Sequence, residues 1–245
     1  MSSADVERVS VSDMVNAHSS VGIVRQALAD ALALVLPVEC AGCDEPDVSL
    51  CEACSAELTP RVERRRLSET VWSGVPFDGV PARVVRALKE DGRTGLARAL
   101  APALRAAVDA ARGEASLESG GPDSVVFVPI PTSRAAFRRR GFRVVELVAR
   151  RAGLPCRALL VPSRGTADQR RLGRADRRRN VRNSLRARDA AGLRVVVLDD
   201  VVTTGATLEE AIRALREGGA DVLGAATIAA TPRRGGGAGA FQTHR

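Results

Sequence analysis

The stretch VVVLDDVVTTGATLEEA, residues 195–211, joins an apolar run to two adjacent acids and a turn of small residues. The apolar run predicts a buried strand that delivers Asp199 and Asp200 to the edge of a sheet. The turn from Thr203 to Thr207 contains one glycine and leads into a helix, whose free N–H groups favour an anion. This order of residues predicts a strand, an anion-binding turn and a helix.

The turn and the acids together favour a phosphorylated sugar as the ligand. The hydroxyl groups of Thr203, Thr204 and Thr207 can donate hydrogen bonds to a phosphate. Paired carboxylates would repel a naked polyphosphate, but they suit a neighbouring diol or a Mg²⁺-bound sugar. A phosphorylated ribose satisfies both halves, with its phosphate in the turn and its hydroxyls on Asp199 and Asp200.

A helix cap is the purely structural interpretation of the same turn. Thr207 would be the N-cap residue, and Glu210 would occupy the third helical position of a capping box. This interpretation explains those two residues, but it explains neither the adjacent acids nor the other hydroxyls.

The rest of the chain predicts an α/β fold around this strand. Short apolar runs at 125–131, 157–162 and 221–230 alternate with helical patterns, which is typical of a parallel sheet with helices on both faces. In such sheets ligands bind beyond the carboxyl ends of the strands. The segment 64–77 predicts a short strand or hairpin.

Two helices are expected between this hairpin and the first apolar run. The first, over 80–90, places Val84, Val85 and Leu88 on one face and is stopped by the Asp-Gly pair that follows. The second is expected at roughly 94–112, followed by a loop over 113–124.

Four cysteines form two Cys-x-x-Cys pairs seven residues apart: Cys40, Cys43, Cys51 and Cys54. This spacing lets two tight turns present four thiolates to one tetrahedral Zn²⁺. Two disulfides are the alternative, which a reducing cytoplasm disfavours. Four cysteine ligands leave no open coordination position, so the predicted zinc is structural. Cys156 stands apart and is expected to be a buried apolar residue.

Composition narrows the classes of function. A chain of 245 residues that is 45% hydrophobic fits one α/β domain with a small appendage. The absence of tyrosine disfavours a nucleic-acid surface built on aromatic stacking. The net charge of +8 fits either a solvated basic surface or a patch for phosphate or nucleic acid. Lys89 is the only lysine, retained either by chance or because a site needs its compact ammonium.

Targeting signals are not expected. An amphipathic helix is predicted within residues 26–36, and no apolar run approaches the ~18 residues that a membrane span requires. The protein is therefore expected to be cytoplasmic and not inserted in a membrane. His18 and His244 lie in the tails, so no catalytic arrangement based on histidine is expected.

Beyond these patterns, the segment from Val195 to Thr207 resembles the phosphoribosyl pyrophosphate (PRPP) motif of type I phosphoribosyltransferases. Over roughly residues 22–230 the chain resembles the ComF family, phosphoribosyltransferase-like proteins linked in bacteria to competence for DNA uptake. Its motifs are matched in order by LPVECAGC…CEAC, by Lys89 and Gly92, by VPIPTSRAAFRRRGF, by Gln169, Leu172, Arg177 and Asn180, and by the PRPP turn.

This resemblance implies a type I phosphoribosyltransferase-like fold with a small N-terminal zinc-binding element. It implies transfer of phosphoribosyl from PRPP to an acceptor, with Mg²⁺ on the pyrophosphate and Asp199 and Asp200 as catalytic residues. The expected PRPP-binding residues are Thr203, Thr204, Gly205, Ala206, Thr207, Lys89 and Arg140. The expected residues of a mobile lid are Arg164, Gln169, Arg177 and Asn180.

Three features leave alternatives open. Where ComF proteins carry Asn-Gln after the RGF segment, this chain has Arg143 and Val144, which fits a drifted substrate site or a new phosphate contact. The arginines at 138–140 lie either near the pyrophosphate or in an exposed basic turn. The segment 164–180 is either the lid or an arm that contacts nucleic acid.

Three hypotheses of function follow: a PRPP-dependent phosphoribosyltransferase, a non-catalytic PRPP or nucleotide sensor in DNA uptake, and a zinc-bearing accessory protein that binds single-stranded DNA. Proteins of the competence machinery are possible partners in each. The predicted organisation is a disordered extension (1–20), a helix with the zinc element (21–60), a phosphoribosyltransferase-like domain (61–230) and a disordered tail (231–245).

Overall fold

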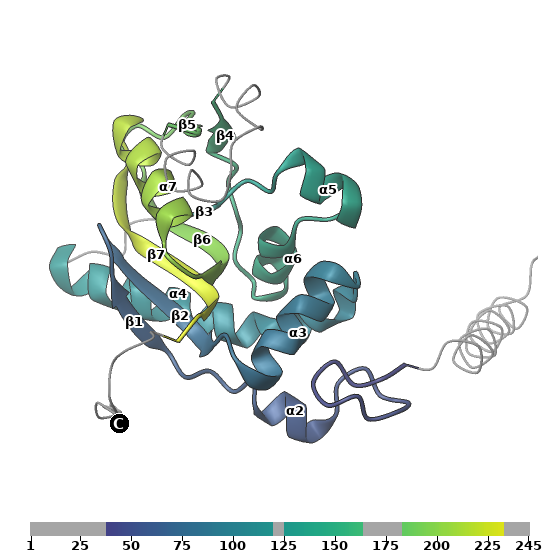
Figure 1. Ribbon diagram of the computed structural model, residues 1–245. Coiled ribbons are helices and arrows are strands. Elements are labelled where there is room, and N and C mark those ends of the chain that lie inside the picture. Colours follow the sequence, from purple (N-terminus) through teal and green to yellow (C-terminus); the bar gives the residue numbers. More distant parts are fainter. Residues whose placement is uncertain (1–37, 120–124, 164–182, 233–245) are drawn as a thin grey trace, which may run out of the picture.

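The computed structural model describes residues 38–119, 125–163 and 183–232, and Figure 1 draws the others in grey. The helices are α2 (Glu52–Ala56), α3 (Gly79–Glu90), the 3-10 helix η1 (Thr94–Leu96), α4 (Ala97–Ser119), α5 (Arg134–Arg140), α6 (Val144–Arg151) and α7 (Ala206–Glu217). The strands are β1 (Glu63–Arg66), β2 (Thr70–Pro76), β3 (Val126–Pro129), β4 (Leu160–Pro162), β5 (Leu185–Ala187), β6 (Arg194–Val202) and β7 (Asp221–Ala230).

Five strands form the central sheet in the order β1-β2-β7-β6-β3. β2, β7, β6 and β3 are parallel, and only β1 runs antiparallel, as the first arm of a hairpin with β2. The predicted hairpin and three of the predicted strands are therefore confirmed. The parallel arrangement places the carboxyl ends of β3, β6 and β7 at one edge of the sheet.

The prediction for 157–162 was wrong about the partner of this segment. Leu160–Pro162 pairs antiparallel with β5 in a separate two-stranded sheet, and a single bridge from Cys156 to Phe127 links the segment to the central sheet. Leu160 is nevertheless buried, on the side of α7. Apolar composition therefore predicted burial correctly, but it does not specify which strand a segment pairs with.

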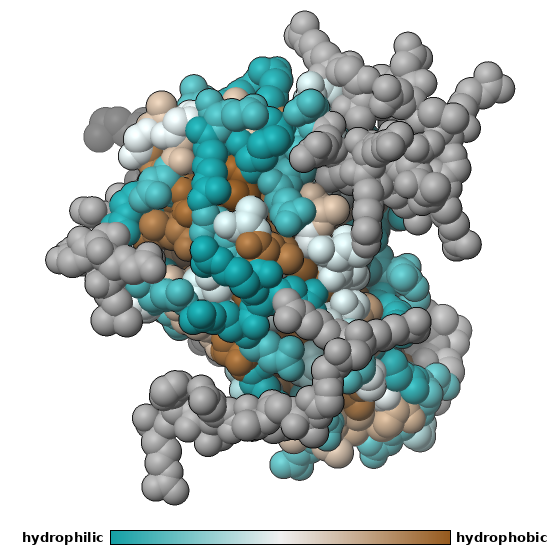
Figure 2. Space-filling view, turned by 60° about the vertical axis from the view of Figure 1, so that its left-hand side comes forward, coloured by the Kyte–Doolittle hydropathy of each residue, from teal (hydrophilic) through white to brown (hydrophobic). Residues whose placement is uncertain are grey.

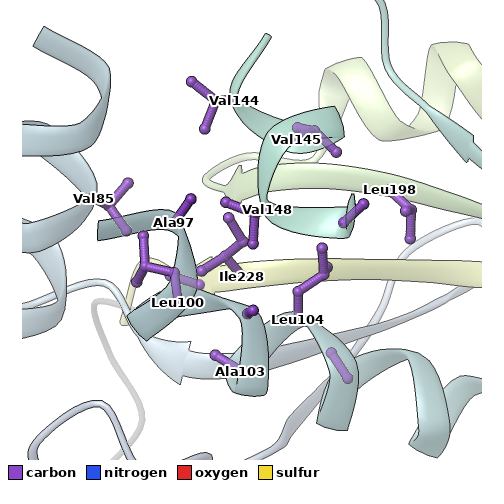
Figure 3. Close-up of a cluster of buried hydrophobic side chains, with 14 of the residues drawn as sticks. Val85, Ala97, Leu100, Ala103, Leu104, Val144, Val145, Val148, Leu198 and Ile228 are labelled. Atoms are coloured by element: carbon purple, nitrogen blue, oxygen red, sulfur yellow. The ribbon is translucent and has the colours of Figure 1, made fainter. Parts of the chain in front are cut away.

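Helices cover both faces of the sheet, with α3, α4 and α6 on one side and α7 on the other (Figure 1). β6 serves both sides because its side chains alternate. Val196 and Leu198 pack with the α3–α4–α6 layer, in the cluster that Figure 3 shows around Leu104, Val148 and Ile228. Val195 and Val197 pack with α7 through its fully buried residues Leu208, Ile212 and Leu215.

The first predicted helix is confirmed as α3, with Val84, Val85 and Leu88 fully buried. α4 is longer than predicted, because it continues through Gly113 to Ser119 where a loop was expected. Alanine-rich sequence tolerates one internal glycine in a helix at a cost of about 1 kcal/mol.

The segment after β3 forms the short helix α5, with the arginines at 138–140 in its last turn. The Ser133 hydroxyl caps this short helix by accepting a hydrogen bond from the Ala136 N–H at 3.2 Å. No residue of α5 is buried.

No helix in the described part of the chain has the length and apolarity needed to cross a membrane. On the face turned forward in Figure 2, hydrophilic residues run between smaller hydrophobic patches. The large hydrophobic side chains that are most exposed among the described residues are Val38, Val62 and Phe137.

Candidate active site

Asp199 and Asp200 lie inside β6, not after its end, because β6 continues to Val202. β3 ends opposite Leu198, whereas β7 continues alongside and pairs Thr227 with Asp199. The strand predicted to end at residue 198 is therefore longer. The two acids sit where one neighbouring strand has ended and the other still holds the backbone in place.

The structure brings Lys89 to Asp200. The Lys89 ammonium Nζ lies 2.8 Å from Asp200 Oδ2, and the two side chains are 24% and 19% exposed. Lys89 occupies the last turn of α3, where the helix dipole favours a cation. The chain's single lysine thus forms a half-buried ion pair with one of the two predicted catalytic acids.

Asp199 has a different environment from its neighbour. Burial and the adjacent Asp200 carboxylate raise the pKa of Asp199 to about 7, although the Asp200 N–H and the Lys89 charge oppose the rise. The Asp200 N–H donates to Asp199 Oδ1 at 2.8 Å. Asp200 is therefore paired with Lys89, while Asp199 takes up a proton near neutral pH.

The turn after β6 ends at Gly205, which is the N-cap residue of α7 with a φ of 85°. This left-handed conformation favours glycine, and a Cβ there would overlap the Leu67 side chain. The N–H groups of Thr204 and Gly205 donate to no backbone carbonyl among the described residues. These N–H groups precede the first residue of α7, so they are available to an anion.

The capping-box interpretation was wrong, since α7 begins at Ala206 and Thr207 is not its N-cap. Glu210 is 3% exposed and serves another purpose. Its carboxylate accepts the Leu185 N–H at 3.0 Å and pairs with Arg213 at 2.8 Å. Glu210 therefore attaches β5 to α7.

Other predicted residues are not brought to the turn. Arg140 is half-buried at the end of α5, and no hydrogen bond or ion pair within the described residues joins it to the turn. The predicted lid residues Arg164, Gln169, Arg177 and Asn180 lie outside the described residues.

Sequence reasoning missed Arg65, which contacts the turn from β1. Its guanidinium donates to the Thr203 carbonyl at 2.8 Å, across 138 positions of sequence. The only feature of the sequence that points to Arg65 is the run of three arginines at 64–66. The sequence of this run does not distinguish its central residue from the other two.

The four cysteines of the N-terminal element converge, with their Sγ atoms all within 4.8 Å of one another. The Sγ atoms of Cys43 and Cys51 are 3.7 Å apart. A tetrahedron with Zn–S bonds of about 2.3 Å has edges of about 3.8 Å, so the arrangement fits zinc. A Cβ on Gly42 would overlap Cys54, which explains the glycine between the first two ligands.

Backbone groups prepare this element for a cation. The N–H groups of Cys51 and Gly42 donate to Cys40 Sγ at 3.3 and 3.4 Å. Burial raises the pKa of Cys40, but these N–H groups and those of its neighbours lower the pKa to about 6 overall. Cys40 is thereby favoured as a thiolate, the form that binds metal.

Arg93 connects the cysteine element to the end of α3. Its Nη2 donates to the carbonyls of Glu39 and Ser49 at 2.7 and 2.8 Å. Arg93 follows α3 by three residues, so it ties the backbone around the cysteines to the helix turn that carries Lys89.

With this geometry, comparison with known proteins assigns a family. Residues 102–237 match the phosphoribosyl transferase domain. The chain belongs to this family. The match includes the acids, the turn and α7 together, and it agrees with the predicted type I phosphoribosyltransferase-like fold.

Relatives narrow the family further. The chain is 36% identical over 143 residues to DNA utilization protein YhgH of Salmonella typhimurium, and 34% identical to that of Escherichia coli K12. The predicted resemblance is confirmed by this similarity. Each match covers 56% of this chain and 61% of the relative.

Three further proteins show similarity to this chain. A stretch of 37 residues, 15% of the chain and 19% of the relative, is 60% identical to orotate phosphoribosyltransferase of Pyrobaculum calidifontis. The solved structure of the allosteric regulatory enzyme of purine biosynthesis has 24% identity and a TM-score of 0.30, over 56% of this chain and 25% of that one. Leishmania donovani UMP synthase has 19% identity and a TM-score of 0.29, over 72% and 30%.

Proposed function

We propose that the chain is a PRPP-binding phosphoribosyltransferase of the ComF type. The observation that carries this proposal is the combination at the end of β6: two acids, one of them paired with Lys89, precede a turn at a helix start, and the Thr204 and Gly205 N–H groups of this turn donate to no backbone carbonyl among the described residues. Phosphate at the turn and ribose hydroxyls at the acids satisfy both parts of the site.

The proposed reaction forms a bond between C1 of the ribose and a nitrogen of the acceptor. The C1–O bond to pyrophosphate breaks, its electron pair leaves with pyrophosphate, and the nitrogen loses a proton. Mg²⁺ bound to the pyrophosphate would neutralise part of the leaving group's charge. The chain's contribution is positioning and charge stabilisation, because the transition state resembles an oxocarbenium ion.

Each acid has its own part in this scheme. Asp200, paired with Lys89, accepts a hydrogen bond from one ribose hydroxyl. Asp199 accepts one from the neighbouring hydroxyl and takes up a proton near neutral pH, since burial raises its pKa to about 7. The Lys89 ammonium keeps the pair of acids from presenting two uncompensated charges to an anionic substrate.

Calorimetric titration with PRPP and Mg²⁺ tests the site, with the Asp199→Asn, Asp200→Asn double variant beside the unsubstituted protein. We expect binding that the double variant loses, while both proteins remain folded at the temperature of the titration. Asp221→Asn, an acid at the opposite end of β7, is the matched control and should bind normally. Equal affinity in the double variant would refute the assignment of the ribose to these acids.

Turnover requires a separate assay, namely pyrophosphate release with PRPP, Mg²⁺ and a panel of purine, pyrimidine and amine acceptors. We place this activity in the cytoplasm and in DNA uptake, a role supported by the relatives that are named for DNA utilization. Binding of PRPP without release of pyrophosphate from any acceptor would favour the sensor hypothesis.

Binding of single-stranded DNA is a second candidate function, supported by one surface. Phe137 is 42% exposed on α5, stacks with Arg143 at 5.4 Å and is followed by the exposed Arg138 and Arg139. Arginine charges beside an exposed ring suit phosphates and a stacked base. Salt-sensitive DNA binding that survives the double Asp substitution but not Phe137→Ala would support this function.

A further inference from the structure

Arg65 links the loops that follow two neighbouring strands. Its Nη1 donates to the Thr203 carbonyl at 2.8 Å, and its Nη2 donates to the Thr231 carbonyl at 2.7 Å. Thr203 follows β6, Thr231 follows β7, and the Thr231 N–H donates to Val202 at 3.0 Å. One guanidinium therefore connects the ends of β6 and β7, beyond the last backbone hydrogen bonds between these two strands.

The contact with Thr203 also sets the direction of the next N–H. In a planar trans peptide the C=O and the N–H point in opposite directions. Because the Thr203 carbonyl faces Arg65, the Thr204 N–H must face away from Arg65. It meets no backbone carbonyl within the described ranges. The hydrogen bond from Arg65 thus orients one of the donors assigned to the phosphate.

The hairpin that carries Arg65 is suited to this task. β1 pairs with β2, a strand whose residues are almost all buried in the sheet. Past Arg65, Leu67 contacts Gly205, and Glu69 pairs with Arg216 on α7. Three side chains of the hairpin therefore contact the turn or its helix.

Only the central arginine of its run can do this. Side chains of a strand alternate between the two faces of a sheet, and Arg65 is half-buried between exposed neighbours. Arg64 instead lies 3.5 Å from Glu114, and Arg66 donates to Thr70 Oγ1 at 2.9 Å. Arg64 and Arg66 are the same residue type as Arg65, but their side chains contact other partners and not the turn.

We propose that Arg65 is a positioning residue for the phosphate of the substrate, through the bond that fixes the 203–204 peptide. The proposal rests on the proposed function, since the phosphate in question is that of PRPP. Two carbonyls are bridged by two nitrogens of one planar group, which a lysine ammonium cannot reproduce at the same spacing. The positive charge beside the turn adds to the attraction for an anion.

Calorimetry with ribose 5-phosphate and with PRPP and Mg²⁺ tests this assignment on four proteins: the unsubstituted chain, Arg65→Ala, Arg65→Lys and the control Arg64→Ala. We expect Arg65→Ala to lose about tenfold in affinity for both ligands, the effect of one hydrogen bond to a charged group. Arg65→Lys should recover only part of this loss, and Arg64→Ala should bind normally. Among the four proteins, only Arg65→Ala should gain affinity when millimolar guanidinium is added. Added guanidinium would not restore affinity if the substitution had acted by a general loss of stability.

Amide hydrogen exchange in the ligand-free proteins gives a readout that does not depend on PRPP. Exchange at Thr231, whose N–H is bonded to the Val202 carbonyl beside the two Arg65 contacts, should quicken in Arg65→Ala and stay unchanged in Arg64→Ala, while the strands β6 and β7 keep their protection. Failure of the unsubstituted chain to bind either ligand would refute the proposed function. Unchanged exchange at Thr231, or full ligand affinity in Arg65→Ala, would overturn the assignment of Arg65 itself.

Discussion

The four cysteines all lie within residues 40–54, whereas the turn after β6 depends on side chains from distant parts of the chain. Arg65 reaches Thr203 across 138 positions, and Lys89 reaches Asp200 from a helix on one face of the sheet. The cysteine element can form from two local turns around one ion. The contacts of Arg65 and Lys89 with the turn region form only when the hairpin, α3 and β6 have assembled. Substitutions in the two regions should therefore have different effects on folding and on ligand binding.

The largest expected effect is on the cysteine element. Replacing both Cys40 and Cys43 with Ser should release zinc and unfold this element, because structural zinc contributes about 10–16 kcal/mol in zinc-finger peptides. The central sheet should still unfold cooperatively. Metal analysis and limited proteolysis measure the two outcomes. Cys156→Ser is the control, since this cysteine lies apart and burial raises its pKa to about 11. Freshly purified, reduced protein without zinc would contradict the assignment.

Substitution in the turn region should affect binding more than folding. Lys89→Met leaves Asp200 half-buried without its cation, and PRPP affinity should fall between about tenfold and a hundredfold. Titration calorimetry and thermal unfolding separate the two effects. Arg86 is an exposed cation on the same helix, and its guanidinium stacks on Phe77. The control Arg86→Met should therefore leave PRPP affinity unchanged. A parallel loss in both variants would mean that only the general charge of α3 matters.

Stability should depend on pH through Asp199. Because burial and Asp200 raise its pKa to about 7, the folded protein holds this proton more tightly than the unfolded chain does. The contribution of Asp199 to stability is therefore fully present below the unfolded pKa of about 3.9 and is lost as pH rises through about 7. The stability of Asp199→Asn relative to that of the unsubstituted protein should therefore rise by on the order of 2 to 3 kcal/mol from pH 5 to pH 8. Urea unfolding at both pH values measures this difference, and a constant difference would show that Asp199 has an ordinary pKa.

The smallest expected effect tests whether the two regions are independent. Arg93→Ala removes the hydrogen bonds between the end of α3 and the backbone around the cysteines. Zinc should remain bound but be lost faster to a chelator, and PRPP affinity should fall by about threefold, less than 1 kcal/mol. Arg98→Ala, an exposed arginine on α4, is the control. Unchanged chelation and affinity would show that the cysteine element does not influence the position of Lys89.

Patterns within short windows predicted a large part of this molecule. The apolar runs gave β3, β6 and β7 because a strand buried on both faces needs continuous apolar sequence. The spacing of the cysteines predicted their convergence, since chelation by a short segment depends on local geometry. The acids, the single glycine and the threonines predicted the PRPP turn and with it the family.

Tertiary structure decided what short windows do not encode. The 157–162 run was predicted to join the central sheet, but it pairs with β5, because apolar composition sets burial and not the strand partner. Glu210 was explained as a cap, but it attaches β5 to α7, since a buried carboxylate takes the donors that the fold brings near.

The sequence by itself determined the strand, the turn, the helix and the four-cysteine cluster, all of which depend on residues close together in the chain. Only the folded chain decided that the single lysine meets Asp200 and that the middle one of three arginines orients the turn. Both contacts join residues far apart in sequence, and their partners are set by the packing of a hairpin and a helix against the same sheet edge.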